Sequence, residues 1–99
     1  MRKIKKLVDE ISEELEGAKG YAEMSVEAKV KNDSIWANRY KEMAQDELKH
    51  AMYLHEQVTA LIAEAGKVAT PPPEMLEKWD AEHVKYVGKA AWIKQMLQL

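Results

Sequence analysis

Proline occurs in this chain only as the run Pro71–Pro72–Pro73, and glycine occurs at only four positions. The rest of the chain is dominated by the good helix formers Ala, Glu, Lys, Leu and Met. A proline inside a helix removes a hydrogen bond and clashes with the preceding turn, so a chain with so few breaks favours long helices. The sequence therefore predicts an all-α protein, with a single helical domain over residues 1–99.

Apolar residues recur along the chain at steps of three and four, which is the period of a helix with one buried face. This pattern predicts a first helix over about 3–31, a second over about 34–65 and a third over about 74–98. A proline-rich linker at 67–73 should separate the second helix from the third, because consecutive prolines favour an extended, stiff spacer.

The first two predicted helices are separated only by Asn32, Asp33 and Ser34, of which Asp33 or Ser34 is a suitable N-cap. So short a connection predicts an antiparallel hairpin. The predicted apolar stripe of the first helix comprises Ile4, Leu7, Val8, Ile11, Leu15, Ala18, Ala22 and Ser25. That of the second comprises Trp36, Tyr40, Met43, Glu47, His50, Leu54, Val58, Leu61 and Ala65.

Three ionisable residues fall on these apolar stripes. Glu14 lies between Ile11 and Ala18 on the first helix, and Glu47 and His50 lie one turn apart on the second. A buried charge is costly unless it is paired or bound to a metal. Carboxylates and an imidazole suit iron, manganese or zinc. Since the three side chains can face one another across a hairpin, the sequence predicts a metal site made of Glu14, Glu47 and His50.

The same residues have a simpler interpretation. Glu-x-x-His is frequent by chance in a chain rich in glutamate, and a histidine on an apolar stripe is usually hydrogen-bonded in a core or interface. On this interpretation Glu47 and His50 pair with each other, or with Arg39 or Lys49. The chain would then be a non-enzymatic helical interaction module that dimerises through its stripes, with or without a structural metal.

Composition narrows the classes of function. The chain contains no cysteine, which excludes disulfides, thiolate zinc sites, iron–sulfur clusters and thiol catalysis. Its formal net charge is −2 and its basic residues are interspersed with acidic ones, so neither nucleic acid nor a membrane is an expected partner. No apolar run suits a signal peptide or a membrane span, and we expect a cytoplasmic protein.

Residues 13–61 resemble the first helical hairpin of the ferritin-like superfamily, especially the rubrerythrins. The resemblance rests on Glu14 and Tyr21, spaced as E-x6-Y, and on the sequence A-Q-D-E-L-K-H-A around Glu47 and His50. The run E-E-L-E followed by Tyr21 is likewise similar to encapsulated-ferritin-like proteins, which are short half-bundles of two helices. This resemblance implies that Glu47 is a bridging carboxylate, His50 a terminal ligand and Glu14 a terminal or bridging carboxylate.

A complete ferritin-like bundle carries two sets of Glu plus Glu-x-x-His on four helices, whereas this chain carries one set. The resemblance therefore implies a homodimer or higher homo-oligomer, in which a twofold axis completes a site for two iron ions, with manganese or zinc as alternatives. The implied activity is iron binding and oxidation with oxygen or peroxide, without catalytic residues beyond the ligands. Tyr21 or Tyr40 would donate a hydrogen bond to a ligand.

The third predicted helix contains no Glu-x-x-His. Its apolar stripe comprises Leu76, Trp79, His83, Tyr86, Val87, Ala90, Ile93 and Leu97. We interpret His83 as a core or interface histidine, with an additional metal ligand as the alternative. His55, Glu56 and Glu82 lie off the predicted stripes and are expected at the surface.

Overall fold

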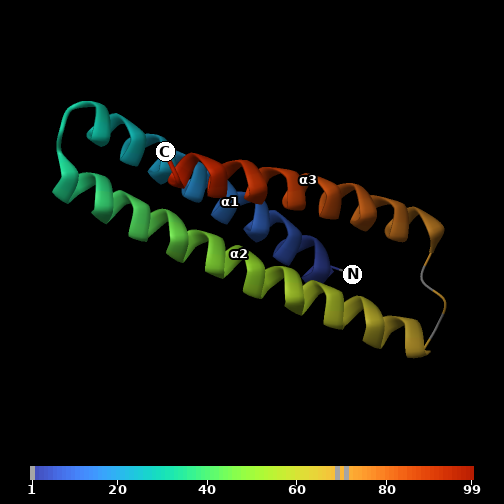
Figure 1. The fold of residues 1–99 in the computed structure, drawn as a ribbon. Helices are drawn as coiled ribbons and strands as arrows, with labels where there is room; N and C mark the ends of the chain where they lie inside the picture. Colours follow the sequence, from blue (N-terminus) through green and yellow to red (C-terminus); the bar gives the residue numbers. More distant parts are fainter. Residues whose placement is uncertain (1, 69, 71) are drawn as a thin grey trace.

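The computed structural model describes residues 2–68, 70 and 72–99, and over these residues the chain forms three α-helices and no strand. α1 spans Arg2–Val30, α2 spans Ser34–Val68 and α3 spans Pro73–Leu97. Figure 1 shows α1 and α2 as an antiparallel hairpin with α3 lying along it. The predicted all-α class is confirmed. None of these helices, over the described residues, has the length and apolar character needed to cross a membrane.

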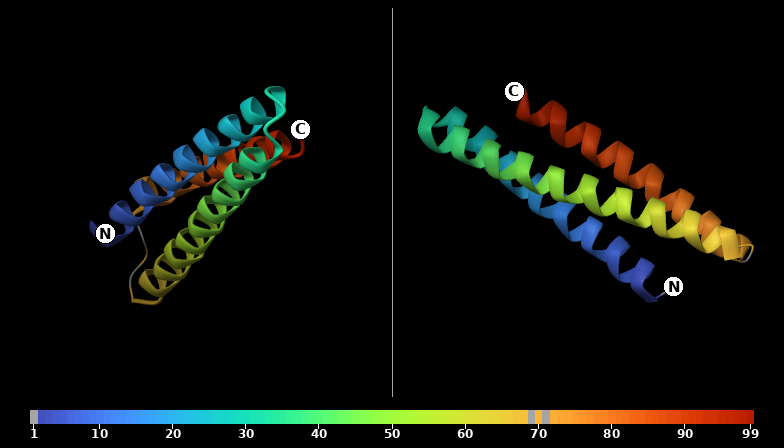
Figure 2. Two further views of the ribbon diagram at one scale, coloured as in Figure 1. Left: turned by 90° about the vertical axis from the view of Figure 1, so that its left-hand side faces the viewer. Right: turned by 90° about the horizontal axis from the view of Figure 1, so that it is seen from below.

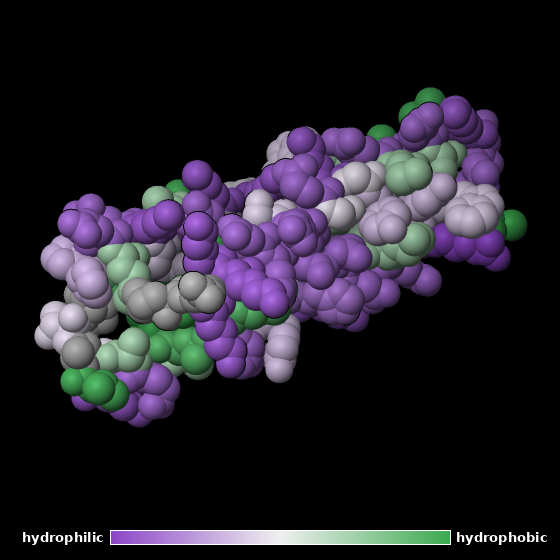
Figure 3. All heavy atoms as spheres, turned by 180° about the vertical axis from the view of Figure 1, so that it is seen from behind, coloured by the Kyte–Doolittle hydropathy of each residue, from purple (hydrophilic) through white to green (hydrophobic). Residues whose placement is uncertain are grey.

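The molecule is a rod with extents of 56 × 17 × 16 Å. The two further views show that α3 follows the hairpin along its length instead of crossing it (Figure 2). Seen from behind, hydrophilic residues cover most of the middle of the rod, and hydrophobic residues gather toward its two ends (Figure 3). Each helix can therefore bury only one stripe of side chains, and the other faces stay open to solvent or to a partner.

The turn between α1 and α2 closes with a capping motif at each helix end. The Asp33 N–H donates to the Ala28 carbonyl at 2.8 Å and the Asn32 N–H donates to the Lys29 carbonyl at 3.0 Å. This pair of bonds requires a left-handed residue, and Asn32, at φ 60°, tolerates that conformation. The Asp33 carboxylate then accepts from the Trp36 N–H at 3.2 Å, which confirms Asp33 as the N-cap of α2.

α2 is longer than the sequence pattern predicts. The pattern places its end at about Ala65 with Gly66 beyond it, but the helix continues to Val68. Gly66 does not end α2, because a glycine that ends a helix usually has a positive φ and no glycine in the described part of the chain has one. Of the predicted linker 67–73, the first two residues belong to α2 and Pro73 begins α3, while Ala69 and Pro71 lie outside the described residues.

Small residues form the contact between α1 and α2. The buried residues of α2 recur every seven positions, as Ala37, Ala44, Ala51 and Val58. They face the stripe predicted for α1, whose members Ile11, Leu15, Ala18, Ala22 and Ser25 are all buried. The backbones come so close that the Ser25 hydroxyl donates to the Ala37 carbonyl of the other helix at 2.8 Å. A seam of alanines at heptad spacing permits this approach, since alanine adds little bulk between helices.

The stripe predicted for α2 is correct at Val58, which is fully buried, but in the first half of the helix it is displaced by one residue. Trp36 and Met43 were expected in the core but are 44% and 38% exposed, and His50 is exposed as well. The pattern favours the larger apolar side chains, whereas the close contact with α1 selects the alanine beside each of them. The predicted stripe instead lines a neighbouring face of α2, on the side of the hairpin away from α3.

α3 packs on the hairpin through a buried segment and an aromatic one. Ala90, Ile93 and Leu97 of α3 join the core formed by α1 and α2. Nearer the start of α3, the His55 ring lies 4.5 Å from the Tyr86 ring and 5.1 Å from the Trp79 ring, measured between centroids.

His55 also meets a second histidine. Its Nε2 lies 2.7 Å from Nδ1 of His83. We call His55, Trp79, His83 and Tyr86 the histidine–aromatic cluster. The expectation that His55 lies at the surface is wrong because α3 partly covers it, whereas Glu56 is exposed as expected.

The alanine seam predicts a strong dependence on side-chain size. Ala44 is fully buried, so Ala44→Leu should destabilise the fold by about 1–3 kcal/mol through overpacking. Ala60 lies on the exposed face of the same helix, and Ala60→Leu should change the free energy of unfolding by less than about 0.5 kcal/mol. Urea unfolding measures both, and equal effects would contradict the assignment of the seam.

The histidine–aromatic cluster predicts a stability that falls in acid. Burial and then the neighbouring His83 lower the pKa of His55 below its ordinary 6.5. The folded state therefore favours the neutral ring: this contribution is present above the unfolded pKa and is lost as pH falls through the folded pKa. We expect His55→Gln to flatten the decline in unfolding free energy between about pH 7 and pH 5, and His50→Gln to leave it in place. An unchanged decline in His55→Gln would show that other groups cause it.

Candidate metal centre

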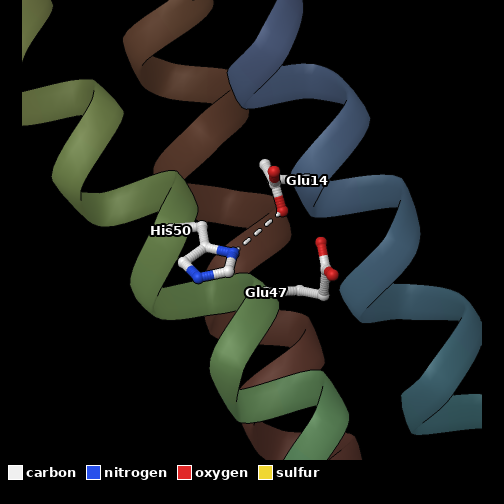
Figure 4. Close-up of side chains that lie close together, drawn as sticks. All are labelled: Glu14, Glu47 and His50. Carbon is white, nitrogen blue, oxygen red and sulfur yellow. Dashed lines mark ion pairs between the residues drawn. The ribbon is translucent and has the colours of Figure 1, made fainter.

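The structure brings the three predicted ligands together. Glu14 extends from the middle of α1, and Glu47 and His50 extend from successive turns of α2 toward it (Figure 4). One ligand atom of each residue lies within 4.8 Å of those of the other two. We call Glu14, Glu47 and His50 the Glu–Glu–His cluster. Its members come close because the alanine seam holds α1 and α2 at short range beside them.

His50 and Glu14 form an ion-pair contact within the cluster. His50 Nδ1 lies 3.5 Å from Glu14 Oε2, and the side chains are 64% and 28% exposed. The alternative pairings expected for the histidine do not occur among the described residues: its partner is neither Glu47 nor a basic residue. Arg39 instead lies over the Trp36 ring, 4.9 Å from its centroid. The imidazole therefore stands on the open side of the cluster, with the carboxylates beneath it.

Glu14 carries an unsatisfied atom. Its Oε2 is buried and accepts no hydrogen bond within the described part of the chain, and the 3.5 Å separation from His50 is long for a charge-assisted hydrogen bond. A buried acceptor without a partner costs about 1–3 kcal/mol. A bound cation or a proton on a neighbouring group would satisfy it.

Glu47 experiences the same shortage of positive charge. A hydrogen bond to Glu14, which Glu47 can make only while protonated, raises the pKa of Glu47, and burial and the Glu14 charge raise it further. The His50 charge opposes this shift. Two carboxylates therefore share a space in which a proton held between them would relieve their repulsion. A metal cation could replace that proton and neutralise both groups.

Gly17 makes room for Glu47. A Cβ atom at position 17 would lie 3.1 Å from Glu47 Oε2, tighter than an ordinary contact. The sequence pattern does not connect this glycine with the site. The sequence feature that could have revealed its role is its position. Gly17 lies one turn after Glu14, in a helix where glycine costs up to about 1 kcal/mol relative to alanine.

α3 contributes nothing to the cluster. In Figure 4, α3 passes behind the hairpin while the three side chains extend on the near side. Glu82 forms an ion pair with Lys85 of its own helix, and His83 belongs to the histidine–aromatic cluster. Tyr21 and Tyr40 stack on each other with centroids 6.4 Å apart, and within the described residues neither hydroxyl is hydrogen-bonded to a ligand. The site is thus a feature of the hairpin, open on one side.

Comparison of the chain with protein-family models, curated proteins and solved structures finds no match. The resemblance to ferritin-like hairpins accordingly stays a prediction from the residues that carry it. What the chain itself provides is a carboxylate–carboxylate–imidazole group at the surface of a helical hairpin, with a buried oxygen that lacks a donor.

The close approach of Glu47 to Gly17 predicts separate effects on stability and on metal binding. Gly17→Ala should raise helix propensity by up to about 1 kcal/mol, yet it should displace the Glu47 carboxylate and weaken metal binding. Gly20→Ala is the matched control, since a Cβ there meets nothing within 4 Å. Thermal unfolding with and without metal measures both effects. Equal metal binding by the two variants would show that the space at Gly17 does not position Glu47.

Proposed function

We propose that this chain is a ferritin-like carboxylate protein that binds iron at the Glu–Glu–His cluster and promotes oxidation of Fe(II) by oxygen or peroxide. The observation that carries the proposal is the convergence of three potential ligands within 4.8 Å, one of which holds a buried oxygen without a donor. Carboxylate oxygens and an imidazole form a ligand set that suits iron. Iron would be the substrate of the site, losing one electron to the oxidant.

One chain supplies half of a di-metal ligand set, and the shape of the molecule supports completion by a second copy. The cluster stands on the side of the hairpin away from α3, where no other element of the chain covers it (Figure 4). Trp36 and Met43 lie on the same face of α2 by helical period and are 44% and 38% exposed. Apolar residues around an open polar site favour an interface. A twofold axis there would bring two hairpins into a four-helix bundle with two of each ligand.

A specific observation favours a second candidate, the non-enzymatic interaction module. The His50 side chain is 64% exposed and lies 3.5 Å from Glu14, and a protonated imidazole there would partly compensate the carboxylates without any metal. An exposed ion pair of this kind contributes little, about 0–1 kcal/mol, and would require no chemistry. The same open face would then serve only to associate two helical hairpins.

Metal loading separates the two candidates. After anaerobic loading with Fe(II) and desalting, the dimer-shared site should retain about one iron per chain, since two chains hold two ions. Glu47→Gln should abolish retention, whereas the adjacent Asp46→Asn, on an exposed side chain, should leave it intact. Without metal, Glu47→Gln should stabilise the fold by about 1 kcal/mol or less, because its amide can donate to Glu14 without charge repulsion.

Sedimentation and oxidation assays complete the experiment. A dimer that retains iron and consumes oxygen or peroxide as Fe(II) is oxidised supports the proposal. A dimer that retains no iron, with the same sedimentation in Glu47→Gln, would favour the interaction module instead. Retention of iron without oxidation would leave a structural metal and would overturn the proposed activity.

A further inference from the structure

Two imidazoles from different helices meet on the α3 side of the hairpin. His55 Nε2 of α2 and His83 Nδ1 of α3 are 2.7 Å apart. At that distance one ring donates its N–H and the other accepts with its nitrogen lone pair, so the two nitrogens face each other across a single proton. A metal ion that replaced this proton would receive both nitrogens as ligands, because neutral imidazole is a common metal ligand.

We propose that His55 and His83 form a second metal site, which takes an imidazole-preferring divalent ion such as Zn²⁺, Cu²⁺ or Ni²⁺ and links α3 to α2. The site differs in chemistry from the Glu–Glu–His cluster, because its two protein ligands are both nitrogen donors. Imidazole ligands suit zinc, copper and nickel, whereas carboxylates suit harder ions. Water would occupy the remaining coordination positions.

The geometry needs only a small adjustment. With metal–nitrogen distances of about 2.0–2.1 Å, two tetrahedral nitrogen ligands lie about 3.3 Å apart, so the rings must separate by roughly half an ångström and turn so that both nitrogens point at the ion. His83 is exposed on α3 and can move by this amount. His55 is held in place by the stacked Tyr86 ring, at an interplanar angle of 16°, and by the Trp79 ring. One fixed ligand and one adjustable ligand therefore face each other.

The charge around the pair favours a cation. Burial and the neighbouring His83 lower the pKa of His55. The neutral imidazole is the form that binds a metal. The Glu56 charge opposes that shift, which places a carboxylate on the same side of the molecule. Of the basic residues near the cluster, Lys85 is paired with Glu82 and Lys89 with Glu16. Their positive charge is thus largely compensated.

A metal site at His55 and His83 would affect the structure because it lies between α2 and α3. Toward the end of α3, that helix and α2 separate around a groove of about 620 Å³, which is lined by Leu48 and Met52 on one side and Ala90 and Leu97 on the other. The histidine–aromatic cluster is therefore the main direct junction between α2 and α3. A metal bound there would stabilise the docked position of α3 by mass action.

Trp79 provides a local probe, since its ring lies 5.1 Å from that of His55. In a Glu47→Gln, Trp36→Phe, Trp92→Phe background, Trp79 is the sole tryptophan and the Glu–Glu–His cluster is disabled. We expect Cu²⁺ to quench its fluorescence saturably, at about one equivalent per chain. His83→Gln should weaken this binding at least about tenfold, the lower end of the loss seen when support of a metal site is removed. His50→Gln should leave it unchanged.

A second measurement keeps the histidine–aromatic cluster intact. The chain has three histidines, so their ring resonances in a nuclear magnetic resonance spectrum can be assigned by single variants. In the Glu47→Gln protein, Zn²⁺ should shift the signals of His55 and His83 together and leave those of His50 in place. Shifts of His50 alone, no shift at all, or Cu²⁺ quenching unaffected by His83→Gln would overturn the second site. Because Glu47→Gln removes the first site, this result is independent of the proposed iron chemistry.

Discussion

The close contact between α1 and α2 determines how the rest of this molecule is arranged. Alanines at heptad spacing on α2 lie against small and medium residues of α1, and a serine hydroxyl reaches the backbone of the opposite helix. Contacts between small side chains bury little area each, but they let two long helices approach along much of their length. The approach leaves no room for large residues in the seam, so Trp36 and Met43 lie beside it.

This displacement produces the candidate site. Glu14, Glu47 and His50 stand at the edge of the seam, near enough to the core for a carboxylate oxygen to lose its water and near enough to the surface for an ion to reach them. If the two carboxylates lay deeper, removing them from water would cost much free energy. If they were more exposed, they would be ordinary solvated charges. Gly17 completes the arrangement by leaving space for the Glu47 side chain.

α3 makes the two sides of the hairpin chemically different. On its own side it brings His83, Trp79 and Tyr86 onto His55, producing an aromatic environment with two imidazole rings. The other side keeps the carboxylates and exposed apolar residues of α1 and α2. The third helix therefore decides which side of the hairpin is partly covered and which stays open.

The sequence by itself determined the number of helices, the turn at Asn32 and Asp33, and the identity of three side chains that converge. These follow from local chemistry: helix propensity, capping groups and residue spacing within a single helix. Only the tertiary structure decided which stripe of α2 is buried, since small alanines carry a weak hydrophobic signal and become favourable only when another helix lies against them. Likewise, His55 and His83 are 28 positions apart, and Gly17 and Glu47 lie on different helices. Such pairs have no local pattern, because their contact depends on how complete helices pack.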